Sequence, residues 1–299
     1  MKVLLAGANS YIGTNLIPVL LQKGHQVVCL VRDPGHFRKS NNYSNAVTVI
    51  SGDLLRRKSI AVLPEDIDAA YYLVNNFAQT SGFAALGAVS AQNFIEVVND
   101  TDCRQIITLC DMNNHATDQV IAKSFIDDIL SSGKPELTTL NATMIVGGGS
   151  MALALFNALT AKAPIIITQN WLKTHLQPIA ISNVLEYMEL CLLSEKTFNR
   201  KFDIGGPEVL LFKQMLLVYI AIFKDFKPSI IVLPFLSAQL SAHLLNTLTP
   251  ESYPGAQSLV ETLKYDSICR ENRIRDIFPI QCITFKQSLG MVKGCSVGA

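Results

Sequence analysis

Two glycines six positions apart, near the start of the chain, constrain the fold more than any other feature. Gly7 follows an apolar run, Lys2–Ala6, that has the length of a buried strand, and Gly13 lies in a helix-like stretch, Tyr11–Lys23. A second apolar run, Gln26–Val31, completes a strand–helix–strand unit. Glycine permits a tight turn at the first position and close helix–strand packing at the second. The unit therefore predicts a βαβ fold of the nucleotide-binding kind.

The loop between the first strand and helix offers its backbone to a ligand. N–H groups at the start of a helix, with the positive end of its dipole, attract a pyrophosphate. The middle glycine of the usual pattern is replaced by Ser10, so the backbone approaches a ligand less freely there. The alternative is a glycine turn in another kind of α/β protein. We expect the pyrophosphate of a dinucleotide to contact Gly7, Asn9, Ser10, Tyr11, Ile12 and Gly13.

The residue at the end of the second strand distinguishes NAD from NADP. An NAD site usually places an acidic residue there, on the ribose 2′-hydroxyl. This chain has Arg32, followed by Asp33. A guanidinium can pair with a 2′-phosphate, and Arg38 or Lys39 could support it. The sequence favours NADP(H). NAD(H) is the alternative, if Arg32 is a solvated strand end and Asp33 binds the ribose.

Short apolar runs alternate with helix-length segments through the first half of the chain, which is typical of a doubly wound parallel α/β sheet. We therefore predict a Rossmann fold with a smaller, mostly helical C-terminal lobe. After the second strand, the predicted strands are 46–51, 69–74, 105–109, 136–140 and 201–204, and the predicted helices are 81–98, 118–130, 151–161 and 182–194.

The carboxyl ends of these strands meet at one edge of the sheet, where a dinucleotide would lie. Asp53, after the third strand, could accept a hydrogen bond from the adenine amino group, or it could cap the next helix. Beyond the loop and Arg32, the positions expected to contact the cofactor are Asp53, Leu54, Val74, Asn75, Cys110, Lys123 and Met144.

Three consecutive glycines, Gly147 to Gly149, mark a change of pattern in the second half. We predict that residues 1–147 and 171–206 form the NAD(P)-binding core, and that residues 148–170 and 207–299 form a substrate or lid lobe. In the returning segment, Trp171, Lys173, His175 and Gln177 could line a substrate pocket or could tie the lobe to the core.

Composition and charge exclude several classes of protein. A net charge of +1 with no basic stripe argues against a nucleic-acid partner. The seven cysteines are dispersed, without zinc-ligand spacing, as in a cytoplasmic protein with reduced thiols and no metal. No signal peptide or membrane-spanning run is visible. The apolar C-terminal segments predict lobe core, a pocket for an apolar small molecule, or a peripheral membrane contact.

The motifs resemble those of the atypical, extended branch of the short-chain dehydrogenase/reductase superfamily, including a nucleoside-diphosphate-sugar epimerase-like bacterial subgroup. The resemblance rests on LLAGANSYIG at the start, LVRDP at 30–34 and SGDL at 51–54. MIVGGGS at 144–150 and FDIGGPEVL at 202–210 extend it into the second half. It implies an oxidoreductase or epimerase-like fold in which a C-terminal lobe closes over the nicotinamide.

The resemblance also implies a Tyr-x-x-x-Lys pair, whose tyrosine exchanges a proton with the substrate. The matching helix carries Gln119 and Lys123, so the lysine is present and the tyrosine is absent. A glutamine amide cannot transfer protons. Lys123 could replace the tyrosine if burial lowers its pKa, or could only bind the ribose or lie at the surface. His115, in the preceding loop, is a second candidate. Cys110 stands where the superfamily has Ser or Thr.

Two functions follow from these observations. The first is an NADPH-dependent reductase or epimerase-like enzyme that acts on a small molecule through Lys123 or His115. The second is a catalytically inactive NADP(H) sensor that regulates a partner, which the missing tyrosine would explain.

Overall fold

The computed structural model describes residues 1–40, 46–60, 62–74, 83–112, 118–161, 165–168, 170–224, 226, 229–232 and 263–297. Of the predicted site residues, Asn75 and His115 lie outside these ranges. The backbone of Lys123 is described as part of a helix, and its side chain is not.

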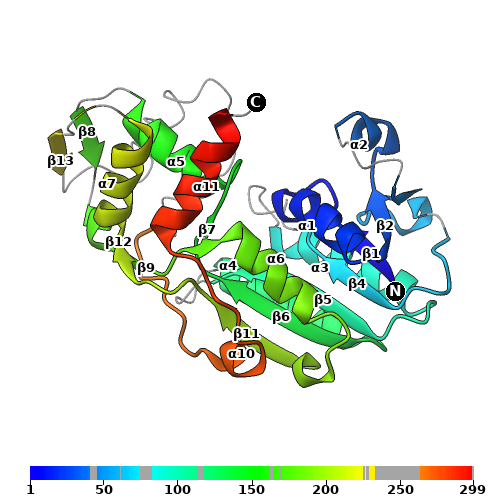
Figure 1. Ribbon diagram of the computed structural model, residues 1–299. Coiled ribbons are helices and arrows are strands. Elements are labelled where there is room, and N and C mark those ends of the chain that lie inside the picture. Colours follow the sequence, from blue (N-terminus) through cyan, green and yellow to red (C-terminus); the bar gives the residue numbers. More distant parts are fainter. Residues whose placement is uncertain are drawn as a thin grey trace.

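A seven-stranded parallel sheet forms the centre of the molecule, in the order β11-β6-β5-β4-β1-β2-β3 (Figure 1). Its strands are β1 (Lys2–Ala6), β2 (Gln26–Val31), β3 (Thr48–Ser51), β4 (Ala69–Tyr72), β5 (Gln105–Asp111), β6 (Glu136–Ala142) and β11 (Arg200–Ile204). The chain order reverses at β1, which pairs with β2 on one side and with β4 on the other. This reversal creates the switch point at which ligands bind in such sheets.

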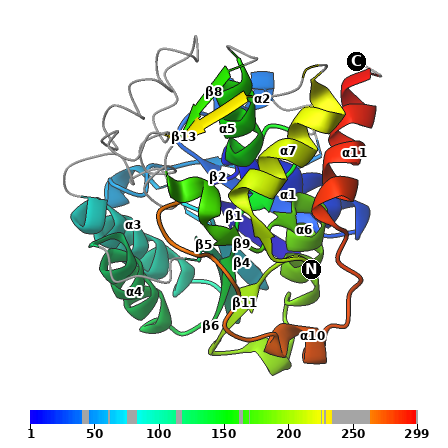
Figure 2. The same ribbon diagram turned by 90° about the vertical axis from the view of Figure 1, so that its left-hand side faces the viewer.

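Helices cover both faces of the sheet. On one face, α1 (Tyr11–Gln22), α6 (Ile181–Leu190) and α10 (Arg273–Ile277) bury apolar side chains against the strands. On the other face lie α3 (Phe83–Val98) and α4 (Asp118–Ser131), which pack against each other (Figure 2). A short helix, α2 (Pro34–Ser40), follows β2, and single turns of 3-10 helix occur at Arg57–Ser59, Asn170–Lys173 and Glu195–Thr197.

The second half of the chain builds a separate apolar cluster around α5 (Met151–Thr160), α7 (Phe212–Phe223) and α11 (Phe285–Val297). An aromatic stack runs through it: the rings of Phe156 and Phe212 are 5.3 Å apart, and those of Phe156 and Tyr219 are 5.2 Å apart. Trp171, the one tryptophan in the sequence, packs edge-on against Phe212. This cluster lies beyond the carboxyl ends of the strands (Figure 1).

Three two-stranded sheets tie this part of the chain together. Their strands are β7 (Ile145–Val146) with β10 (Ile179–Ala180), β9 (His175–Leu176) with β12 (Leu210–Leu211), and β8 (Ile165–Thr168) with β13 (Ser229–Val232). The fold class predicted from the sequence, a Rossmann sheet with helices on both faces, is confirmed. The division into domains stays a prediction, and Trp171, Leu172 and Leu176 pack in the second cluster although the predicted boundary placed them in the core.

Candidate functional site

The glycine loop lies at the carboxyl end of β1, beside the end of β4. Gly7 has a φ of 88°, a backbone conformation that residues with a side chain rarely adopt. A Cβ on Gly7 would also lie 2.4 Å from the carbonyl oxygen of Leu73. A Cβ on Gly13 would lie 2.4 Å from the carbonyl oxygen of Gly7. Both glycines are therefore required by close backbone contacts, which bring the start of α1 against the sheet.

Ser10 caps α1 and leaves part of the helix terminus free. Its hydroxyl oxygen accepts from the Gly13 N–H at 3.0 Å, and its own N–H donates to Gly7 at 2.9 Å. Within the described chain, the N–H groups of Tyr11 and Ile12 have no acceptor. Free N–H groups at a helix start fit an anionic group. This helix start, which the two glycines allow to lie against the sheet, therefore fits a dinucleotide pyrophosphate.

The end of β2 carries the two residues that bear on the choice of cofactor. Arg32 is exposed, and its guanidinium forms no ion pair with a described residue. One carboxylate oxygen of Asp33 accepts the His36 N–H at 2.9 Å and so caps α2. Pro34 occupies the first position of that helix. The Asp-Pro pair is the sequence signal for α2, which the sequence analysis missed.

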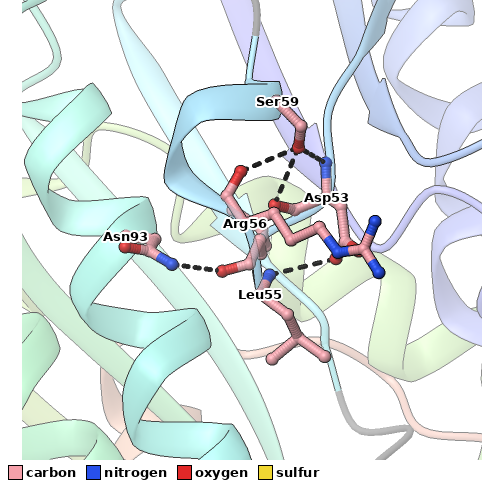
Figure 3. A network of polar contacts seen from close by, with 6 residues as sticks. Asp53, Leu55, Arg56, Ser59 and Asn93 are labelled. Atoms are coloured by element: carbon pink, nitrogen blue, oxygen red, sulfur yellow. Dashed lines mark hydrogen bonds and ion pairs between the residues drawn. The ribbon is translucent and has the colours of Figure 1, made fainter.

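The end of β3 is a tightly hydrogen-bonded loop around Asp53 (Figure 3). Asp53 Oδ1 accepts from the Leu55 N–H at 3.0 Å, and Oδ2 lies 4.0 Å from Arg56 Nε. The Ser59 hydroxyl accepts from the Asp53 N–H at 2.9 Å. Asn93 on α3 donates to the Leu54 carbonyl at 2.7 Å. The Asp53 carboxylate is thus half-buried and held in place as the cap of this turn. It keeps an oxygen that can accept a hydrogen bond from a ligand.

The remaining predicted contacts follow the ends of β4, β5 and β6. Val74, Cys110 and Met144 are all half-buried. Cys110 lies close enough to Tyr72 to raise the pKa of the tyrosine further, although burial is the larger cause. Met144 accepts from the Ile179 N–H at 2.9 Å. Lys123 lies on α4, on the face of the sheet opposite α1.

A contact that no sequence pattern predicted joins the glycine loop to the second cluster. The Tyr11 ring packs against Gly147 and Gly149, so that a Cβ on Gly147 would lie 2.6 Å from the Tyr11 hydroxyl. Burial raises the pKa of Tyr11 to about 12, and the nearby Ser150 hydroxyl opposes this rise. Ser150 is the N-cap of α5. The loop that would hold the cofactor thus touches the first helix of the second cluster.

The described residues contain neither a metal-binding group nor a membrane-spanning helix. Among the described residues, no group of three His, Cys, Asp or Glu side chains is placed to hold a metal ion. No helix in the described part of the chain is both long enough and apolar enough to span a bilayer.

Comparison with known proteins supports the site. Residues 7–134 match a sequence family described as NAD(P)H-binding. The match spans β1 to α4, which contain the glycine loop, Arg32 and Asp53. Among curated proteins, none matches this sequence.

Solved structures share the fold of the whole chain at low sequence identity. A nucleoside-diphosphate-sugar epimerase from Staphylococcus aureus is 13% identical with a TM-score of 0.74, covering 97% of this chain and 99% of its own. MoeE5 in complex with UDP-glucuronic acid and NAD is 11% identical with a TM-score of 0.73, covering all of both chains. The terminal R domain of the myxalamid pathway is 13% identical with a TM-score of 0.72, covering 99% and 91%. These likenesses show the fold that the resemblance to the extended dehydrogenase/reductase superfamily implied.

Proposed function

We propose that this protein is an NADPH-dependent oxidoreductase or epimerase-like enzyme that acts on a small molecule without the usual tyrosine. The glycine loop carries the proposal, because Gly7 and Gly13 leave a backbone cradle at the switch point of the sheet. When bound, a nicotinamide cofactor supplies hydride transfer. Solved proteins of the same fold include one in complex with UDP-glucose and NAD.

The protein contributes binding and orientation. The N–H groups of Tyr11 and Ile12 hold the pyrophosphate, together with Gly7, Asn9, Ser10 and Gly13. Asp53 accepts from the adenine amino group, beside Leu54. Contacts along the ends of β4 to β6 are made by Val74, Asn75, Cys110 and Met144.

Arg32 selects NADPH over NADH in this proposal. Its guanidinium is exposed, while Asp33 is engaged at the start of α2. We expect Arg32→Ala to weaken NADPH binding by roughly 10- to 150-fold, since a charged hydrogen bond contributes about 1.5–3 kcal/mol. NADH binding should stay nearly unchanged. Titration calorimetry with both cofactors measures this, and Arg57→Ala is the control, because Arg57 pairs with Glu96 instead. Equal losses for both cofactors would refute the assignment of Arg32 to the 2′-phosphate.

Proton transfer is assigned to Lys123 or His115. Gln119, at the tyrosine position, cannot transfer a proton. We expect Lys123→Ala or His115→Ala to lower kcat by at least 100-fold on a carbonyl and quinone panel while NADPH still binds. If both variants turn over at the wild-type rate, neither residue is the acid.

The second candidate is a binding protein that senses the NADP(H) state. The missing tyrosine supports it. A sensor should discriminate NADP⁺ from NADPH in binding and transfer hydride to no substrate on the same panel. Turnover of any one metabolite with a kcat/KM in the enzymatic range would exclude it.

The second cluster, with α5 carrying no charged residue, supports an apolar small-molecule substrate. We also propose the division into a core of residues 1–147 and 171–206 and a lobe of 148–170 and 207–299, and a cytoplasmic location.

A further inference from the structure

Tyr11, the first residue of α1, contacts two parts of the molecule at once. Its backbone N–H belongs to the helix start and has no acceptor within the described chain. Its ring leaves the glycine loop and packs against Gly147 and Gly149, far along the sequence. One residue thus offers a hydrogen-bond donor to a cofactor and a packing surface to the turn that precedes α5.

The turn that receives the ring is held closely on its other sides. The Ser150 N–H donates to the Gly147 carbonyl at 3.0 Å. The Ser150 hydroxyl oxygen accepts the N–H groups of Gly147 and Leu153, both at 3.3 Å, and so joins the turn to the first turn of α5. Behind Gly147 lies Ile181, whose Cγ2 would be 2.4 Å from a Cβ on that glycine. A displacement of the Tyr11 ring must therefore displace the turn and the start of α5 with it.

Packing, and not a hydrogen bond, holds the ring in this place. The Tyr11 hydroxyl oxygen is buried, and it has no hydrogen-bond partner within the described chain, although the Ser150 hydroxyl is near. A buried hydroxyl without a partner lowers stability. The hydroxyl is thus not what fixes the ring, and a phenylalanine should occupy the same space.

We propose that Tyr11 is a positioning residue, through which a bound cofactor sets the turn 147–150 and the start of α5. This inference rests on the proposed function, because it needs a dinucleotide at the Tyr11 N–H. A pyrophosphate oxygen bound there fixes the first turn of α1. The ring extends from the same Cα, so it fixes the turn, and the second cluster takes its substrate after the cofactor. Such coupling is reciprocal: a change at the turn alters cofactor affinity by the same factor.

Amide hydrogen exchange of the full chain, with and without NADPH, measures the effect of the cofactor on α5. We expect NADPH to slow exchange in residues 151–160 by about threefold or more. Tyr11→Phe should keep this effect. Tyr11→Ala should lose it and still bind NADPH, because the backbone N–H remains. Should Tyr11→Ala fail to fold, Tyr11→Leu, which keeps an apolar side chain without a ring, takes its place.

Titration calorimetry with NADPH measures the reciprocal effect. Ser150→Ala removes the cap of α5 and leaves the glycine loop unchanged. It should weaken NADPH binding by up to about fivefold, the factor that corresponds to the loss of a helix cap. In the Tyr11→Ala protein the same change should have no further effect. The matched control is Gln214→Ala, which removes the comparable side-chain contact at the start of α7 and should leave the affinity unchanged.

The outcomes separate this inference from the proposed function. If the wild-type protein binds NADPH and exchange in α5 does not change, the coupling is wrong and the cofactor site stands. If Ser150→Ala weakens binding equally with and without the Tyr11 ring, Ser150 contacts the cofactor itself and Tyr11 transmits nothing. Loss of the effect in Tyr11→Phe would overturn the packing argument. If the wild-type protein binds neither NADPH nor NADH, the proposed function fails and this inference fails with it.

Discussion

Gly7 combines a positive φ with a backbone contact that leaves no room for a side chain. Replacing it with alanine strains the φ and drives the new Cβ into the Leu73 carbonyl, 2.4 Å away. We expect Gly7→Ala to lower the free energy of unfolding by about 3 kcal/mol or more, since strain and steric overlap add. NADPH binding should be lost with it. Urea unfolding and calorimetry measure the two effects.

Gly24 provides a matched control. It has a φ of 79°, but a Cβ there would meet no atom within 4 Å. Gly24→Ala should therefore cost only the φ strain, about 1 kcal/mol, and leave NADPH binding intact. Equal destabilisation by the two substitutions would show that the contact with Leu73 contributes nothing.

The structural roles of these site residues could be predicted from the sequence to different extents. The need for Gly7 and Gly13 is local, because a strand and a helix joined by a short loop leave little backbone freedom, so the pattern predicted it. The contact of Tyr11 with Gly147 joins positions far apart in the sequence. No local pattern encodes it. Asp33 shows a third case: beside Pro34 it caps α2, a local role that was not predicted from the sequence.

At the scale of elements, α4 is joined to the sheet by an ion pair whose carboxylate is buried. Asp127 Oδ2 lies 2.8 Å from Lys201 Nζ on β11, and the carboxylate is buried whereas the lysine is half exposed. Burial raises the pKa of Asp127, and Lys201 only partly offsets this. The folded protein therefore keeps a proton that the unfolded chain releases. Stability falls as pH rises from the ordinary pKa of Asp to the raised one.

Asp127→Asn removes that titration. We expect the unfolding free energy of the variant to vary less with pH across this window, because the amide stays neutral on both sides of it. Urea unfolding between pH 4 and pH 8 checks this. Asp128→Asn, an exposed neighbour on the same helix, should keep the wild-type slope. An unchanged slope in Asp127→Asn would mean that the carboxylate ionises in the folded protein as it does in the unfolded chain.

Elements with strong local patterns were predicted well, and those that depend on distant partners were not. β1, β2 and the bodies of α3, α4 and α5 agree with their apolar periodicity. The pairing of β8 with β13 joins segments more than sixty residues apart. From the sequence alone, the short apolar runs of these two strands cannot be distinguished from segments of a buried helix. The predicted strand 69–74 ends at Tyr72, where its ladder with β1 and β5 stops.

At the scale of the whole molecule, Gln177 joins the sheet to the second cluster. Its side chain donates to the Gly206 carbonyl at 2.8 Å and accepts the Cys269 N–H at 2.9 Å. Its backbone N–H donates to Ser267, whose hydroxyl reaches the Met112 carbonyl at the end of β5. Of the two sequence interpretations for this residue, a pocket wall or a tie, these contacts support the tie. Because of these contacts, we expect the sheet and the second cluster to unfold in one transition.

We expect Gln177→Ala to cost about 1–3 kcal/mol, because it leaves the Cys269 N–H without its partner and removes one of the two donors to the Gly206 carbonyl, the other being Arg275. Trp171 fluorescence reports on the second cluster, and far-ultraviolet circular dichroism reports on all helices and strands. In the wild type the two urea transitions should coincide, whereas in Gln177→Ala the fluorescence transition should come first. Gln92→Ala, on exposed α3 surface, should leave them coincident. If Gln177→Ala also unfolds in one transition at the wild-type midpoint, the coupling runs through other contacts. The contact of Tyr11 with Gly147 is the next to test, because it would link cofactor binding to the second cluster.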